Sequence, residues 1–197
     1  IANLGFPYRA KAINWDKRYL PFPYWPISMH FGKVVSGQSI ISKYPILGQK
    51  RVVLQRVANA SFFRDAFYID RLAQIVKVQI QDKEVIVINI HLEAFDAPTR
   101  KSQMQEVMQL LEVYKNRPVI LLGDFNSEAR DPDSAIQQLL QHPEYGCAAY
   151  TNHNPENTFD SVNPVRRIDY IFYSKKNIKE ISSKVLSYFG ESSDHLP

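Results

Sequence analysis

The sequence contains a single cysteine, Cys147, so the chain cannot form an internal disulfide. No apolar run reaches the ~18 residues of a membrane-spanning helix, and no transmembrane segment is predicted. The N-terminus lacks a basic start followed by an apolar stretch, so no signal peptide is visible. These absences fit a soluble protein that is either cytoplasmic or exported with its signal removed.

Repeats, low-complexity tracts and linkers are also absent, and a length of 197 residues is typical of one domain, here spanning residues 1–197. Hydrophobic residues make up 45% and charged residues 22%, as in ordinary globular proteins. The 24 basic and 20 acidic residues give a net charge of +4. This excess is compatible with a polyanionic partner and equally with a mixed solvated surface. A monomer is favoured.

The hydrophobic pattern predicts strands, then a helix, then further strands. Residues 1–36, rich in aromatic, basic and proline residues, are expected to be irregular. The predicted strands are Ser39–Tyr44, Val52–Val57, Leu72–Ile80, Glu84–Leu92, Val119–Leu122, Arg167–Ser174 and Val185–Phe189. The polar stretch 81–83 predicts a hairpin, and helical spacing of apolar residues predicts helices over 98–115 and 134–141. This order indicates an α/β domain with helices packed on sheet.

Four segments place an acid or a histidine beside a buried strand or at the end of the chain. They are Asn89–Leu92, Leu122–Ser127, Arg167–Ile171 and Ser192–Pro197. An unpaired buried charge is costly, so polar groups in such positions need partners. The four segments satisfy one another if they converge in the fold.

Asp124 and Asn126 lie two residues apart, so on an extended backbone both side chains face the same way. A carboxylate can orient and deprotonate a water, and an amide can donate to charge developing on phosphorus. The alternative is an Asx turn that follows a strand without any catalytic role.

Histidine and aspartate at the other positions also have two interpretations. His91 is either a structural histidine or part of a site. Asp169 is unexpected within a strand, where aspartate is depleted. It either forms an ion pair with Arg166 or Arg167 or orients a catalytic histidine, whose tautomer and basicity it would set.

Together these motifs resemble the endonuclease/exonuclease/phosphatase superfamily, which includes deoxyribonucleases, inositol polyphosphate phosphatases and neutral sphingomyelinases. The matching segments, in the order of the family, are Gly37–Ile46, Asn89–Leu92, Gly123–Ser127, Arg167–Ile171 and Ser193–His195. The resemblance implies a deoxyribonuclease-like, four-layered α/β sandwich, in which two packed mixed β-sheets are flanked by helices and the site lies at one end of the sheets.

The resemblance also implies the roles of the site residues. Asp124 would position or activate water, and Asn126 would contact phosphate and help to orient Asp124. His91 would be a second histidine that contacts phosphate. His195, paired with Asp169, would stabilise the pentacoordinate phosphorane.

A metal ion is implied by the same resemblance. Asp194 would contribute to a site for Mg²⁺, with Mn²⁺ as an alternative. The family carries an early strand with Asn and a second with Gln-Glu, whose Glu is the main metal ligand, and neither precedes Gly37. We therefore expect a chain truncated at both ends, lacking its first strands and its last strand. Such a fragment would bind metal poorly and be weakly active or inactive, whereas the full-length parent would be the enzyme.

The substrate is left open by the sequence. Aromatic and basic residues interleave between Phe6 and Lys33, which suits either a nucleic-acid-binding lip or a long loop with its own aromatic core. Arg64 and Arg71 flank Phe67-Tyr68 and would either reach substrate phosphate or form surface ion pairs.

Three functions are compatible with these patterns. The first is a nuclease-like phosphodiesterase that depends on magnesium and hydrolyses a phosphate ester. The second is a phosphohydrolase acting on a lipid, an inositol phosphate or sphingomyelin. The stretch 158–161 resembles both sphingomyelinase-like and deadenylase-like members, so it does not decide between the first two. The third is a catalytically inactive binding domain.

Overall fold

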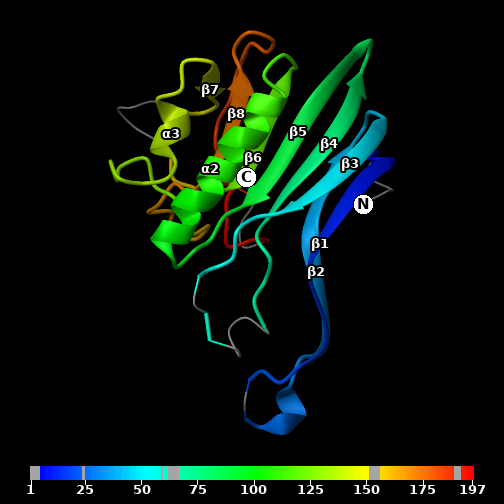
Figure 1. Cartoon of the computed structure of the whole chain (residues 1–197), viewed down its shortest axis with the longest axis vertical. Helices are drawn as coiled ribbons and strands as arrows, with labels where there is room; N and C mark the ends of the chain where they lie inside the picture. Colours follow the sequence, from blue (N-terminus) through cyan, green and yellow to red (C-terminus); the bar gives the residue numbers. More distant parts are fainter. Residues whose placement is uncertain (1–4, 24, 59, 62–66, 151–155, 189–191) are drawn as a thin grey trace.

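The computed structural model describes residues 5–23, 25–58, 60–61, 67–150, 156–188 and 192–197. Its strands form two sheets (Figure 1). The smaller sheet is an antiparallel ribbon of β1 (Tyr8–Leu20) and β2 (Gly32–Ser42). The larger sheet has six strands in the order β3-β4-β5-β6-β8-β7. Their bounds are β3 Ile46–Val53, β4 Leu72–Ile80, β5 Lys83–His91, β6 Val119–Asp124, β7 Tyr145–Cys147 and β8 Asp169–Ser174.

The large sheet is mixed. β5 and β6 are parallel, whereas β3–β4, β4–β5, β6–β8 and β7–β8 are antiparallel. Parallel neighbours need a crossover connection, and helix α2 (Ala97–Val113) supplies it. Two shorter elements complete the described structure, the 3₁₀ helix η2 (Ile27–Met29) and helix α3 (Gln137–Leu140). None of the described helices is both long and apolar enough to cross a bilayer.

Apolar side chains pack on both faces of the large sheet. On one face, Met104 and Leu111 of α2 join a buried cluster with the strands, and each is at most 1% exposed. On the other face, Ala10 of β1 packs with Val76 and Val78 of β4. Figure 1 shows α2 and the β1–β2 ribbon on opposite sides of this sheet. The described residues thus form three layers, which confirms the predicted α/β sandwich class.

Helix α2 begins where Asp96 caps it. The Asp96 side chain accepts a hydrogen bond from Thr99 N at 2.9 Å, and Pro98 lies in the first turn, where a missing N–H leaves no bond unmade. We expect Asp96→Ala to lower the free energy of unfolding by ~1 kcal/mol, measured by urea denaturation. Asp96→Asn keeps the acceptor oxygen and should stay close to wild type. An equal loss in both variants would contradict the capping role.

Most of the predicted elements are confirmed. The strand Leu72–Ile80 coincides with β4, and the predicted hairpin joins it to β5. The predicted helix 98–115 corresponds to α2, and the predicted helix 134–141 corresponds to the shorter α3.

The expectation that residues 1–36 are irregular is wrong, because they hold β1, η2 and the start of β2. In β1, the buried Ala10 and Ala12 alternate with the exposed Arg9 and Lys11. Alanine is depleted in strands, so a reading that weighs strand propensity misses this alternation.

Two further strand predictions are corrected. The strand expected at Val52–Val57 lies earlier, as β3, because Val53 pairs with Leu72 and β4 begins there. No strand occupies the described part of Val185–Phe189, and Phe189 itself lies outside the described residues. Residues 185–188 form a loop and a turn, in which Val185 N donates to the Glu156 side chain and not to a strand.

Candidate active site

Three predicted site residues form a row across the large sheet. His91 ends β5, Asp124 ends β6 and Asp169 begins β8. The strand register pairs His91 with Asp124 and Asp124 with Asp169. Paired residues on neighbouring strands point to the same face, so the three side chains lie side by side at one edge of the sheet. The parallel β5–β6 pair and the antiparallel β8 are what bring together residues far apart in the sequence.

Asn126 holds the carboxylate of Asp124. Asn126 N donates to Asp124 Oδ1 at 2.8 Å, and Asn126 Nδ2 donates to Asp124 Oδ2 at 3.1 Å and to Leu92 O at 3.0 Å. The left-handed backbone of Asn126, with φ of 48°, permits this turn, and asparagine tolerates that conformation. Burial raises the pKa of Asp124, although the Asn126 N–H opposes the shift.

His195 binds the far end of the row. Its Nδ1 lies 2.8 Å from Asp169 Oδ2. Burial by itself would lower the pKa of His195, yet the hydrogen bond and charge of Asp169 raise the pKa above its ordinary value, with help from Asp124. Of the two interpretations of Asp169, the structure therefore shows the pair with histidine. The alternative partners are engaged elsewhere, since Arg166 pairs with Glu128 at 2.7 Å and Arg167 donates to backbone carbonyls.

The stretch 158–161 supports the His195–Asp169 pair. The buried Thr158 hydroxyl accepts hydrogen bonds from the backbone N–H groups of Ile168 and Asp169, at 3.2 Å each. The Phe159 ring packs against the His195 ring, with 4.9 Å between centroids. These contacts fix both members of the pair in place.

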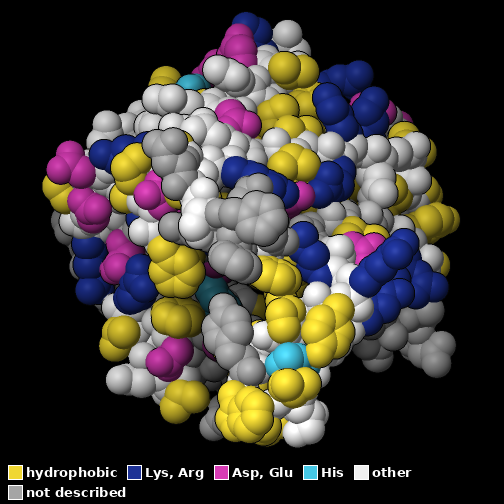
Figure 2. Space-filling model, turned by 60° about the horizontal axis from the view of Figure 1, so that its bottom comes forward, with side chains coloured by type: hydrophobic (Ala, Val, Ile, Leu, Met, Phe, Trp, Pro, Cys, Tyr) yellow, Lys and Arg dark blue, Asp and Glu magenta, His cyan; other side chains and the backbone are white. Residues whose placement is uncertain are grey.

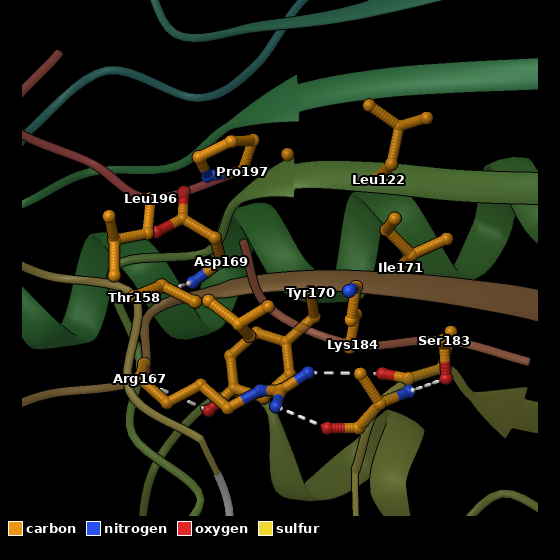
Figure 3. A pocket seen from close by; sticks show the side chains of 14 residues that line it. Leu122, Thr158, Arg167, Asp169, Tyr170, Ile171, Ser183, Lys184, Leu196 and Pro197 are labelled. Carbon is orange, nitrogen blue, oxygen red and sulfur yellow. Dashed lines mark hydrogen bonds between the residues drawn. The ribbon is translucent and has the colours of Figure 1, made fainter. Parts of the chain in front are cut away.

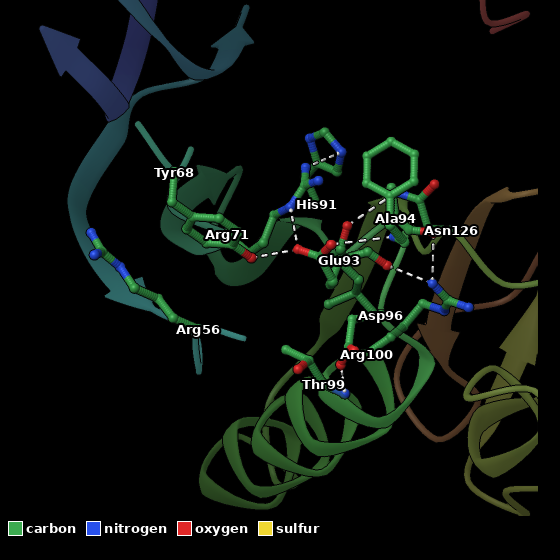
Figure 4. A network of polar contacts seen from close by, with 12 residues as sticks. Arg56, Tyr68, Arg71, His91, Glu93, Ala94, Asp96, Thr99, Arg100 and Asn126 are labelled. Carbon is green, nitrogen blue, oxygen red and sulfur yellow. Dashed lines mark hydrogen bonds and ion pairs between the residues drawn. The ribbon is translucent and has the colours of Figure 1, made fainter. Parts of the chain in front are cut away.

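His91 lies between Asp124 and Arg71, and Figure 4 shows it beside Arg71. Its Nε2 is 3.5 Å from Asp124 Oδ2 and 2.6 Å from Arg71 Nη1. A guanidinium only donates, so Nε2 accepts from Arg71 and the remaining proton is assigned to Nδ1. Burial lowers the pKa of His91, and the charge of Arg71 lowers it further, against the opposing effect of Asp124. His91 is therefore a neutral imidazole.

Arg71 is held by a buried carboxylate that the sequence analysis did not single out. Glu93 is 1% exposed, and its Oε2 lies 3.5 Å from Arg71 Nε and accepts a hydrogen bond from Tyr68 OH (Figure 4). Burial and the bond to Glu93 raise the pKa of Tyr68 to about 12. Arg71, predicted to contact substrate, thus faces His91 and Glu93, while Arg64 lies outside the described residues.

The described residues do not by themselves fit a divalent metal ion. Asp194, the predicted ligand, is exposed, and its carbonyl oxygen accepts a bond from Ser161 N at 2.9 Å. In the part of the chain that the structure describes, no group of three or more His, Cys, Asp and Glu side chains could hold a metal.

Two hollows adjoin the row of site residues. One, of about 360 Å³, lies next to Asn126 and is lined by basic and acidic side chains, among them Arg100 and the ion pair of Arg166 with Glu128. The other, of about 240 Å³, lies beside Asp169 and is lined largely by apolar groups, including Leu122 and Ile171 (Figure 3). The site thus offers a polar surface that carries charges of both signs on one side and an apolar surface on the other.

Comparison with solved structures reveals the same fold elsewhere. An endonuclease/exonuclease/phosphatase from Beutenbergia cavernae superposes with a TM-score of 0.72 at 19% identity, over 99% of this chain and 53% of that one. The human Nocturnin catalytic domain gives 0.65 at 16% identity, over 99% and 71%. Sphingomyelinase C from Streptomyces griseocarneus gives 0.58 at 17% identity, over 92% and 66%. At such identities the likeness concerns the fold alone.

The chain spans about half the length of the first of these structures. No curated protein matches the chain. A family model described as the endonuclease/exonuclease/phosphatase family, however, matches residues 4–195, which is nearly the whole sequence. The chain belongs to the endonuclease/exonuclease/phosphatase family.

Proposed function

We propose that the natural protein containing this chain hydrolyses a phosphodiester by attack of water at phosphorus. Members of the family are usually hydrolases that act on phosphoester bonds. The observation that carries the proposal is the row of His91, Asp124 and Asp169, with His195 bound at its end. This row joins a carboxylate that can accept a proton to an imidazole that can supply one, as general acid–base hydrolysis requires.

We assign to Asp124 the role of orienting and deprotonating the attacking water. The N–H groups of Asn126 fix the direction of its carboxylate oxygens, so a water bound there would be oriented. Burial raises the pKa of Asp124, which makes the carboxylate a stronger base than an exposed aspartate. A base whose pKa approaches the working pH removes a proton from water more effectively.

We assign to His195 the role of stabilising the negative charge that develops on the phosphoryl group. Its Nδ1 is bound to Asp169, so its Nε2–H points away from that carboxylate. The raised pKa of His195 favours the imidazolium, which donates to a phosphate oxygen or protonates the leaving group. Asp169 is thus a positioning residue, which holds His195 and whose charge also acts on Asp124.

We assign to His91 and Arg71 the binding of a non-reacting phosphate oxygen. His91 accepts at Nε2 from Arg71, which leaves the Nδ1 proton to donate. Arg71 supplies the positive charge that a neutral histidine lacks, and Glu93 fixes its orientation.

Asp169→Asn is expected to move the whole pH profile of kcat/KM to lower pH. Asp124 must be deprotonated, which sets the acid limb, and His195 must be protonated, which sets the alkaline limb. The charge of Asp169 raises the pKa of both groups, so its removal lowers both. The rate should also fall roughly tenfold to a hundredfold. The measurement is a pH series of initial rates.

The matched control is Asp133→Asn, the same substitution at an exposed aspartate. It should leave both limbs unchanged. A uniform loss of rate in Asp169→Asn with both limbs in their wild-type positions would show that Asp169 supports only the structure.

The substrate is tested by a panel. A nuclease-like activity predicts turnover of DNA or RNA. The second candidate, a lipid, inositol-phosphate or sphingomyelin phosphohydrolase, draws support from the apolar hollow beside Asp169. Because members of the family generally use divalent metals, we propose Mg²⁺, or Mn²⁺ in its place, as the added ion, with EDTA as the blank. A folded protein inactive on every substrate would instead be a binding domain.

A further inference from the structure

The β1–β2 ribbon ends in a tip that exposes apolar side chains. We define the hairpin tip as residues 21–23 and 25–31, which follow β1 and lead into β2; Figure 1 shows it well beyond the edge of the large sheet. Its exposed side chains are Phe22 at 50%, Trp25 at 78%, Ile27 at 62%, Met29 at 62% and Phe31 at 61%. Figure 2 views this end and shows hydrophobic side chains gathered there, with basic side chains nearby. An exposed apolar group of this size marks an interaction site.

The hairpin tip is preformed. Phe31 N donates to Phe22 O at 3.0 Å, and the two rings pack with 5.8 Å between centroids. The turn η2 lies between them, with His30 N donating to Ile27 O at 3.1 Å. The apolar side chains are therefore presented by an ordered turn, and a partner would not have to fold it.

Basic residues lie on the ribbon next to the hairpin tip. Between Asp16 and Asp65 the sequence contains eight Lys and Arg residues and no Asp or Glu. Three of the eight, Lys17, Arg18 and Lys33, lie on the ribbon next to the tip. An apolar turn framed by cations fits a surface that is negatively charged outside and apolar below.

We propose that the hairpin tip docks on the surface of an anionic phospholipid bilayer. Tryptophan and phenylalanine enter the interface between headgroups and acyl chains, and basic side chains are attracted to anionic headgroups. The interleaved aromatic and basic residues also raise the alternative of a nucleic-acid surface. Ile27 and Met29 favour the bilayer, because these aliphatic side chains offer no ring on which a base could stack.

The direction of the strands places the tip and the candidate active site at the same end of the molecule. Arg51 of β3 donates to Ile13 O, and Gln49 donates to Lys11 O, so β1 and β3 run the same way. β3 and β5 are both antiparallel to β4, so β5 also runs this way and ends at His91. Docking would thus turn the row of site residues toward the bilayer. This orientation favours a lipid phosphoester among the candidate substrates, an inference that rests on the proposed function.

Vesicle binding tests the docking directly. The wild-type protein should co-sediment with vesicles of phosphatidylcholine and phosphatidylserine, more weakly with phosphatidylcholine alone, and less as salt is raised. Ile27→Ser should weaken partitioning about tenfold. Ile181→Ser is the matched control, because Ile181 is 95% exposed and lies outside the tip, and it should bind like wild type. Substituting Lys33 by a neutral residue should weaken binding to anionic vesicles about fivefold, because one positive charge is lost.

Tryptophan emission gives a second readout. Trp25 is one of two tryptophans, and its emission should shift to shorter wavelength on anionic vesicles, a shift that Trp25→Phe should abolish. Equal vesicle binding by Ile27→Ser and Ile181→Ser would overturn the proposal. The absence of vesicle binding would also overturn the proposal. In that case the tip could bind single-stranded nucleic acid, or it could mediate a dimer that Ile27→Ser dissociates; neither result would support docking on a bilayer. Asp124→Asn should bind vesicles like wild type, so failure of docking and failure of catalysis are separate results.

Discussion

An Asp124→Asn protein is expected to hydrolyse its phosphoester substrate at least ~100-fold more slowly than wild type. The substitution keeps the size of the side chain and an oxygen that can accept from Asn126 N, so the turn is retained. An amide cannot take a proton from water, however, and it carries no charge to balance His195. The loss should therefore fall on kcat and leave KM close to its wild-type value.

Asp133→Asn again serves as control, because it makes the same chemical change at an exposed position. Thermal unfolding of both variants checks that the fold is intact. If Asp124→Asn retained a rate within about threefold of wild type, Asp124 would have no part in activating the water.

Gly123→Ala should have the largest effect on stability, with a loss of ~3 kcal/mol or more in the free energy of unfolding, or no folded protein at all. Gly123 precedes Asp124 and has φ of 135°, a conformation that side-chain-bearing residues rarely adopt. A Cβ at this position would overlap the carbonyl oxygen of Ile90 on the neighbouring strand β5. Backbone atoms cannot move aside as a flexible side chain does, so β5 and β6 would have to separate.

Gly48→Ala is the matched control for this substitution. Gly48 lies in β3 of the same sheet, and a Cβ there meets no atom within 4 Å. Urea denaturation should show little change for Gly48→Ala. A Gly123→Ala protein as stable as the Gly48→Ala protein would contradict the close approach of β5 and β6 at the site.

Local sequence reveals the polar ends of the strands but not their arrangement. Asp169 attracts notice because aspartate is rare in strands, and Asp124 because it follows a buried run with Asn two residues later. Their alignment depends on the pairing of β6 with both β5 and β8, which is set by tertiary packing. This pairing joins Asp124 to His91, 33 positions away, and to Asp169, 45 positions away.

Glu93 and Tyr68 show what sequence reading leaves out. A glutamate after a strand is usually solvated, and the burial of Glu93 follows only from its contacts with Arg71 and Tyr68, which come from a distant segment. Its position two residues after His91 was the one available signal. The β1–β2 ribbon is not predicted, because its segment is rich in proline and aromatic residues and is therefore interpreted as irregular.

If the proposed hydrolysis occurs at the row of His91, Asp124 and Asp169, its rate also reports correct refolding. A shift of β6 by one residue against its neighbours would turn Asp124 to the opposite face, toward α2, and would remove its carboxylate from the site. A compact but misaligned chain could regain its secondary structure and still have no activity. After denaturation, recovery of turnover should therefore lag behind recovery of the circular dichroism signal by the time that the strands need to align.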